Sequence, residues 1–291
     1  MKKSILFVKV KSRLGLINPP KGRKKQNIGV EEGPDYILSK NFINLFPSAE
    51  EIVFKFSDPE QIERHDYYEI LAKEYQQLIK KIGEKYKEQT ILVTVGGDHS
   101  ISLGSVSEVL NLYDPLTTGV IMIDSHGDIH QPATSPSDNF HGMWLRPVVD
   151  SFQIASINNL VIKKLPMNNL IYIGNLDIEK EEKIFIKNNA IYTFNQSEIN
   201  TSDFRKKLSS FIKKMCHIHL SIDIDAFCHA YAPATGMMVK NGLKPSDVFP
   251  ILNILKDHES LSVDLVEVNP IIKDYGKTIQ LAQEILLAIL K

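Results

Sequence analysis

Carboxylate and imidazole side chains cluster where one apolar run of the chain ends. Asp124, His126 and Asp128 follow the apolar residues 119–123 at spacings of two residues. In an extended segment, side chains at i, i+2 and i+4 lie on the same side, so these three groups converge on one point. Carboxylates and imidazoles both bind divalent cations, and the spacing therefore predicts a metal site.

Two other segments repeat this arrangement. His99 follows the apolar run 91–95, and Asp223 and Asp225 follow the run 216–220. The candidate ligands are four carboxylates and two imidazoles: His99, Asp124, His126, Asp128, Asp223 and Asp225. Four buried carboxylates require compensating cations, and two divalent ions would balance their charge. An oxygen-rich set without thiolate favours Mn²⁺ over Mg²⁺, Co²⁺ or Zn²⁺.

A pair of divalent cations lowers the pKa of water and makes hydroxide available near neutral pH. The residues therefore predict metal-assisted hydrolysis. Asp98 is interpreted as a support for His99 or as an acceptor of backbone hydrogen bonds, and not as a ligand. His217 and His219 share one face of a predicted strand, and we interpret them as packed or hydrogen-bonded sheet residues.

The composition predicts a single globular domain over residues 1–291. The chain has 43% hydrophobic residues and a formal net charge of −1, so nothing in the balance calls for nucleic acid or an anionic membrane. The basic run Lys21–Lys25 is expected to be a solvated loop. Lys9 and Lys11 interrupt the N-terminal apolar run, which argues against a signal peptide, and no stretch approaches the ~20 apolar residues of a membrane span.

The cysteines indicate a reducing compartment, and we expect a cytoplasmic protein. Only Cys216 and Cys228 occur, without CxxC spacing, which excludes a disulfide scaffold. Cys228 stands beside His229, but one thiol and one imidazole do not make a soft-metal site.

Short apolar runs alternate with amphipathic segments along the chain, which predicts an α/β fold with a mostly parallel sheet covered by helices on both faces. Ligands in such sheets bind at the carboxyl ends of strands, where the candidate residues lie. Ser202 is a candidate helix N-cap, and Pro245 suits a first helical turn. The expected strands are Ser4–Val10, Glu51–Phe56, Ile91–Val95, Gly119–Ile123, Leu170–Ile173, His217–Ile222 and Ser262–Val268. The expected helices are Tyr67–Tyr86, Ser102–Leu112, Thr201–Lys214, Pro245–Lys256 and Lys277–Leu290.

These motifs together resemble those of the ureohydrolases of the arginase superfamily, most closely the arginases. The resemblance runs from near the N-terminus to the last helix, in the order of the family: GVEEGP at 29–34, GGDHS at 96–100, DxHxD at 124–128, SxDxD at 221–225, PATG at 233–236 and EVNP at 267–270. It implies a three-layer α/β/α fold with an eight-stranded parallel sheet. It also implies two Mn²⁺ per chain and a homo-oligomer, a trimer or hexamer.

The resemblance also implies a reaction and the residues that perform it. A metal-bridging hydroxide attacks the guanidinium carbon of L-arginine, and urea and L-ornithine leave. Glu267 pairs with the guanidinium, Asp128 helps accept a proton, and His141 shuttles protons with solvent. EVNP follows the largely apolar residues 263–266, which favours this role for Glu267 over that of an ordinary strand-end carboxylate.

The segment after DxHxD holds the substrate α-carboxylate in arginases. A gapless match places His130, Ser135, Ser137 and Asn139 there, with His130 in place of an amide. Glu179 matches the carboxylate that accepts a hydrogen bond from the substrate α-amino group, with a longer side chain. The family's Asp-Pro after SxDxD is Cys228-His229 here, and its Thr-Pro after Thr-Gly is Met237-Met238. These departures border the cleft, so the substrate specificity can differ from that of the arginases.

Three alternatives to an arginase remain. An agmatinase would not need the carboxylate-binding hydroxyls, which argues against it. A formimidoylglutamase would cleave an amidine-type C–N bond on an amino acid, and Ala230–Pro233 is compatible with it. A catalytically silent family member could serve as a binding subunit, but all six ligand positions hold residues that bind metal.

Overall fold

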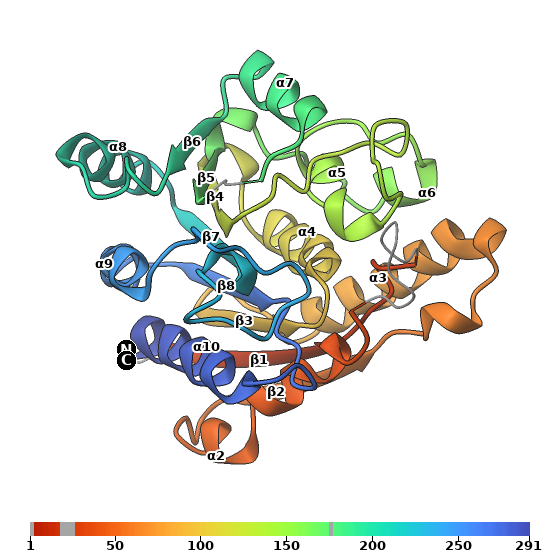
Figure 1. Cartoon of the computed structure of the whole chain (residues 1–291), viewed down its shortest axis with the longest axis horizontal. Coiled ribbons are helices and arrows are strands. Elements are labelled where there is room, and N and C mark those ends of the chain that lie inside the picture. The colour runs from red at the N-terminus through yellow and green to blue at the C-terminus, as the bar shows by residue number, and fades with distance from the viewer. Residues whose placement is uncertain (1–2, 18–26, 175–176) are drawn as a thin grey trace.

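The centre of the fold is a sheet of eight parallel strands (Figure 1). The computed structural model describes residues 3–17, 27–174 and 177–291, so the basic run 21–25 lies outside the described residues. The strand order is β2-β1-β3-β8-β7-β4-β5-β6. The strands are β1 (Ser4–Lys11), β2 (Glu50–Lys55), β3 (Thr90–Gly96), β4 (Thr118–Asp124), β5 (Leu170–Gly174), β6 (Tyr192–Asn195), β7 (His217–Asp223) and β8 (Leu261–Val266).

The inner strands are apolar because both faces of the sheet are covered. Every residue of β4, β5, β7 and β8 is buried, as expected for a parallel sheet between two helical layers. The edge strands β2 and β6 are largely exposed and correspondingly polar.

Helices cover both faces and enclose two separate cores. One core packs α3, α4, α5, α6 and α7 against the sheet, and the other packs α1, α2, α8, α9 and α10 against its opposite face. Figure 1 shows α3 and α4 on one side of the strands and α9 and α10 on the other. The helices are α1 (Gly33–Ile37), α2 (Lys40–Ile43), α3 (Tyr67–Gly83), α4 (Ser102–Leu112), α5 (Arg146–Val149), α6 (Ala155–Asn158), α7 (Lys180–Asn188), α8 (Ser202–Ile212), α9 (Pro245–Leu255) and α10 (Tyr275–Leu290). This arrangement confirms the predicted three-layer α/β/α fold.

The seven predicted strands and five predicted helices are present, with three corrections. The sequence did not predict the eighth strand, β6. It also did not predict helix α7 or the short helices α1, α2, α5 and α6. The N-cap of α8 is Thr201 and not Ser202, because the Thr201 side chain accepts the Phe204 N–H. Strand β8 ends at Val266 and not at Val268, because Glu267 takes a φ of 65° and turns the chain.

The prediction for Pro245 is confirmed, since it stands in the first turn of α9. In the part of the chain that the structure describes, no helix combines the length and apolar character needed to cross a membrane.

Candidate metal centre

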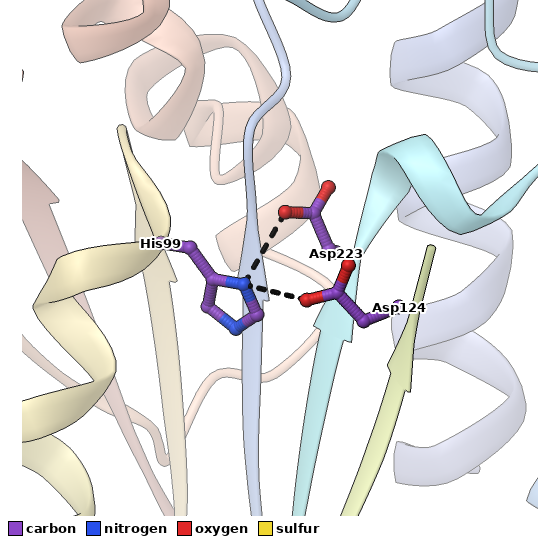
Figure 2. A group of neighbouring side chains, drawn as sticks. All are labelled: His99, Asp124 and Asp223. Carbon is purple, nitrogen blue, oxygen red and sulfur yellow. Dashed lines mark ion pairs between the residues drawn. The ribbon is translucent and has the colours of Figure 1, made fainter. Parts of the chain in front are cut away.

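The candidate ligands lie at the carboxyl ends of neighbouring strands. His99 follows β3, Asp124 ends β4 and Asp223 ends β7, while Glu267 follows β8. These four strands are adjacent in the order β3-β8-β7-β4. Figure 2 shows the side chains of His99, Asp124 and Asp223 pointing toward one another from three of these strand ends. The sheet thus gathers groups that are far apart in the sequence.

His99 Nδ1 is the centre of the first ligand group. It lies 3.0 Å from Asp124 Oδ2, 3.0 Å from Asp128 Oδ2 and 3.2 Å from Asp223 Oδ2, and all four residues are buried. On the other side of the ring, His99 Nε2 lies 2.9 Å from the Ser221 hydroxyl. This contact orients the imidazole so that Nδ1 faces the carboxylates.

His126 forms a second group with Asp124 and Asp225. His126 Nδ1 lies 3.1 Å from Asp225 Oδ2 and 3.5 Å from Asp124 Oδ1. Asp124 therefore presents one oxygen to each imidazole. Within each of the two groups, His99–Asp124–Asp223 and Asp124–His126–Asp225, the candidate ligand atoms lie within 4.8 Å of one another. The result is two adjacent clusters that share one carboxylate.

Buried polar atoms in these clusters lack hydrogen-bond partners. They include His99 Nδ1, Asp124 Oδ2 and Asp225 Oδ1. Burial, together with repulsion from Asp225 and Asp124, raises the pKa of Asp223 well above its usual range, and burial raises the pKa of Asp225 to about 6. A bound cation would supply both the missing partner and the compensating charge. The residues present therefore fit divalent metal ions.

The turn that carries His99 is fixed by its neighbours. Asp98 accepts hydrogen bonds from the Ser12 hydroxyl at 3.0 Å and from the Ser100 backbone N–H at 3.0 Å, which confirms its interpretation as a backbone acceptor. Gly97 is required beside it, because a Cβ atom there would lie 1.9 Å from the Ser12 carbonyl oxygen. The backbone entering His99 is thereby held close to the end of β1.

Glu267 and His141 lie together beside the first cluster. Glu267 Oε1 accepts the backbone N–H of His99 at 3.0 Å, and Oε2 accepts a hydrogen bond from the Asn27 side chain at 3.1 Å. His141 Nδ1 lies 3.5 Å from Glu267 Oε1. Burial lowers the pKa of His141, but the hydrogen bond and charge of Glu267 outweigh burial and leave the pKa raised. A titratable imidazole therefore stands between the buried carboxylates and the adjoining cleft.

The cleft that adjoins the clusters has a volume of about 510 Å³. Its lining includes every residue predicted to contact substrate: His130, Ser135, Ser137, Asn139, Glu179 and Glu267. Ser135 Oγ accepts the Asp138 N–H at 3.0 Å, which leaves its hydroxyl hydrogen for another acceptor. Met237 and Met238 add apolar surface where the sequence departs from the family pattern.

His130 is engaged with protein groups at both ring nitrogens. Nε2 lies 2.7 Å from Glu179 Oε2 and 3.8 Å from Glu182 Oε1, and Nδ1 lies 3.1 Å from Thr134 Oγ1. The imidazole thus occupies one oxygen of the carboxylate predicted to bind a substrate amino group. A ligand of Glu179 has to share it with His130 or displace the imidazole.

Three residues of the site were not predicted from the sequence. Asn27 contacts Glu267, and nothing in its local sequence signals this. Trp144 Nε1 donates a hydrogen bond to Asp128 Oδ2 at 3.1 Å. Glu182 accepts the Ile129 N–H at 3.2 Å, and its spacing of three from Glu179 at a helix start was an available signal.

The residues predicted to lie outside the metal site do so. His217 and His219 hydrogen-bond to the Ser262 hydroxyl at 2.8 and 2.9 Å within the sheet. Cys228 Sγ lies 3.9 Å from His229 Nδ1, and the thiol donates to a backbone carbonyl.

A parallel α/β sheet with carboxylates and imidazoles clustered at its carboxyl edge, beside a cleft, fits a metal-dependent hydrolase. A family model described as the Arginase family matches residues 16–291. Arginase of Staphylococcus aureus strain COL is 32% identical over 289 residues, which cover 92% of this chain and 94% of that protein. The chain belongs to the arginase family and is a hydrolase acting on guanidino C–N bonds.

Solved structures agree with this assignment. The crystal structure of Entamoeba histolytica arginase in complex with L-ornithine has a TM-score of 0.84 and 25% sequence identity, covering 99% of this chain and 98% of that one. Formimidoylglutamase of Bacillus subtilis has a TM-score of 0.73 at 16% identity, covering 99% of this chain and 86% of that one. The second likeness is one of fold alone.

Proposed function

We propose that this protein is an arginase that hydrolyses L-arginine to L-ornithine and urea with two Mn²⁺ per chain. The ligand residues proposed for the ions are His99, Asp124, His126, Asp128, Asp223 and Asp225. One observation carries the proposal: the cleft that opens onto these groups also contains hydroxyls and a carboxylate suited to the amino-acid end of the substrate. The S. aureus arginase, at 32% identity over 92% of this chain, gives independent support.

The polarity of the cleft matches L-arginine at both ends. The hydroxyls of Ser135 and Ser137 can donate to an α-carboxylate, and the Glu179 carboxylate can accept from an α-ammonium group. At the other end, the charge of Glu267 suits a guanidinium. A substrate that lacks one of these groups leaves a polar partner unsatisfied at a cost of about 1–3 kcal/mol.

The protein groups divide the chemistry between them. Bound divalent cations supply positive charge and lower the pKa of water, so that a nucleophile forms near neutral pH. Glu267 orients the guanidinium, and Asp128 accepts the proton that water gives up. The oxygen of that water adds to the guanidinium carbon, and the bond from this carbon to the nitrogen on Cδ breaks. That nitrogen takes a proton and leaves as the side-chain amine of ornithine, and the carbon keeps the new oxygen and its two amino groups as urea. His141, a quarter exposed at its side chain, exchanges protons between the site and solvent.

A urea and ammonia assay with four substrates tests the function. Mn²⁺-loaded protein is assayed with L-arginine, agmatine, 4-guanidinobutyrate and formimidoylglutamate. Agmatine lacks the carboxylate and guanidinobutyrate lacks the α-amino group, so L-arginine should exceed each by roughly ten- to hundred-fold in kcat/KM. A higher kcat/KM for agmatine or formimidoylglutamate would overturn the arginase assignment. Turnover of none of the four would indicate a silent family member.

Metal analysis tests the proposed ion content separately. Metal-free protein dialysed against MnCl₂ should retain about two Mn²⁺ per chain, and Asp124→Asn should lose the most because Asp124 faces both imidazoles. One ion per folded chain in the unmutated protein would contradict the binuclear proposal.

A further inference from the structure

The only tryptophan of the chain lies against two of the proposed metal ligands. Trp144 is fully buried and stands in the sequence between the 3-10 helix Phe140–Gly142 and α5. Its Nε1 donates a hydrogen bond to Asp128 Oδ2 at 3.1 Å. The centroid of its ring lies 5.1 Å from that of the His99 imidazole, at an interplanar angle of 41°. One indole therefore touches both members of the 3.0 Å contact between Asp128 and His99.

Asp128 needs support from outside its own loop. Its backbone has a φ of 51°, in the left-handed region that L side chains rarely adopt. The carbonyl oxygen of Asp128 accepts the Leu145 N–H at 3.1 Å, next in sequence to the tryptophan that holds its carboxylate. Main chain and side chain of Asp128 are thus both held by the 144–145 segment.

We infer that Trp144 is a positioning residue for metal binding, and that its fluorescence reports the occupancy of the centre. A hydrogen bond from N–H to an ionised carboxylate is stronger than one between neutral groups, so it fixes the direction of Asp128 before a cation arrives. Partners of this kind typically change metal affinity by ten- to hundred-fold when they are removed. The indole touches ligands and not substrate, and its effect on turnover is exerted through Asp128.

A purely structural role for Trp144 makes a different prediction. If the ring only filled the core, phenylalanine would retain much of its function, because both are large planar apolar side chains. The indole N–H is the feature that phenylalanine lacks. Trp144→Phe therefore separates the hydrogen bond to Asp128 from the packing of the ring.

A control should remove a buried aromatic donor that does not touch a ligand. Tyr67 is fully buried, and its hydroxyl donates to the Leu14 carbonyl at 2.9 Å. Tyr67→Phe deletes one aromatic hydrogen-bond donor, as Trp144→Phe does, but leaves Asp128 and His99 untouched. The pair of variants matches in burial and in the loss of one hydrogen bond.

The experiment is a titration of metal-free protein with MnCl₂. Bound metal is measured by equilibrium dialysis and elemental analysis, and tryptophan emission is recorded at the same points. The unmutated protein should change its emission in proportion to bound Mn²⁺, because indole emission responds to nearby charge and paramagnetic ions quench it. Trp144→Phe should bind Mn²⁺ about ten-fold or more weakly, and Tyr67→Phe should bind like the unmutated protein.

Unchanged Mn²⁺ affinity in folded Trp144→Phe would overturn the positioning role, and so would an equal loss in Tyr67→Phe. If Trp144→Phe does not fold, the tryptophan emission of the unmutated protein during the MnCl₂ titration tests the inference. An emission that stays constant while bound Mn²⁺ reaches saturation contradicts the contact on which the inference rests. No urea is measured, so failure of the arginine assignment leaves this result standing.

Discussion

His141 is the proposed site residue whose surroundings best suit proton transfer. It lies 3.5 Å from Glu267 and a quarter of its side chain reaches solvent, whereas the imidazole of His99 is almost fully buried among carboxylates. Glu267 raises the pKa of His141 and so keeps the imidazolium form available at higher pH than usual. An imidazole that reaches both the cleft and solvent is suited to general acid–base work.

We predict that His141→Asn lowers kcat for L-arginine by about ten-fold or more and leaves the Mn²⁺ content unchanged. The reason is that His141 contacts Glu267 but belongs to neither ligand cluster. His65→Asn is the matched control, because its side chain is 77% exposed and lies outside the site. The measurement is kcat by urea release from pH 7 to 9.5, with metal analysis of the same samples. Equal kcat in variant and unmutated protein across that range would remove His141 from the mechanism.

Glu179 differs from the other proposed contacts because it already has a partner. His130 takes one of its oxygens at 2.7 Å, yet nearly half of the Glu179 side chain is exposed. The Glu179 side chain therefore remains accessible from the cleft that it lines. The proposed contact between Glu179 and the substrate α-amino group is far from the reacting carbon. It is therefore made in the ground state and the transition state alike.

We predict that Glu179→Ala raises KM for L-arginine by about ten-fold and lowers kcat much less. The KM for 4-guanidinobutyrate should change little, since that compound has no α-amino group to lose. Glu181→Ala controls for general loss of charge on α7, because Glu181 is exposed nearby. Initial rates with both substrates provide the test. A drop in kcat with unchanged KM would show that Glu179 does not bind the substrate amino group.

At the scale of elements, the strongly patterned segments were predictable and the others were not. Strands β4 and β7 are buried along their whole length, so their apolar runs are continuous in the sequence. Strand β6 has four residues, of which one is buried, so its sequence shows no clear strand pattern. Its backbone pairing with β5 is what makes it a strand. Helix α7 has nine residues, is rich in charge and buries a single apolar side chain, that of Ile186, so it was missed as well.

In the candidate site, too, some residues could be predicted from the sequence and others could not. The ligands could be predicted because they share a short local spacing at strand ends. The contact of Asn27 with Glu267 joins residues 240 positions apart, and that of Trp144 with Asp128 depends on how the 140–145 segment folds back. Neither contact leaves a periodic signal in the chain.

The start of α7 contains a buried carboxyl group whose loss of a proton opposes folding as pH rises. Glu182 is 3% exposed and accepts the backbone N–H groups of Ile129 and Glu179. Burial is the main cause that raises its pKa from 4.5 to about 7, against the opposing charge of His130. Between these values the folded state binds more protons than the unfolded state, so the free energy of unfolding falls as pH increases.

We predict that the free energy of unfolding depends less on pH in Glu182→Gln than in the unmutated protein. The fall in this free energy between pH 4.5 and about 7 should be smaller by up to about 3 kcal/mol. Glutamine does not ionise, although it accepts one hydrogen bond fewer, which lowers stability by a similar amount at every pH. Urea unfolding of metal-free protein at pH 5, 6, 7 and 8 gives the slopes, with Glu181→Gln as the exposed control. Parallel curves for Glu182→Gln and the unmutated protein would contradict the assigned pKa.

At the scale of the whole molecule, one sheet joins β1 near the N-terminus to β8 and is covered by α10 near the C-terminus. The single domain over 1–291, the homo-oligomer of three or six chains and the cytoplasmic location stay predictions. The four central strands all end at the candidate centre. Metal binding there should therefore couple to the stability of the entire sheet.

Removal of metal should lower the unfolding temperature because it leaves like charges together in the interior. The ligand atoms of His99, Asp124 and Asp223 lie within 4.8 Å of one another, and repulsion together with burial already raises the pKa of Asp223. Ions that bind only the folded state stabilise it by about 2.7 kcal/mol at a free concentration of 100 Kd. For a chain of this size that corresponds to roughly 4–5 °C in Tm.

We predict opposite effects of Asp223→Asn in the two metal states. Without metal, the variant should unfold at the same temperature as the unmutated protein or higher, because the neutral amide removes the cost of burying the carboxylate and its repulsion by Asp225 and Asp124. With MnCl₂ present, it should gain less than half of the Tm increase of the unmutated protein, because a charged ligand is missing. Calorimetry with a chelator and with MnCl₂ gives both values. Asp203→Asn, an exposed carboxylate on α8, is the control and should keep the full increase. If Asp223→Asn also keeps the full Tm increase with MnCl₂, Asp223 does not bind the metal.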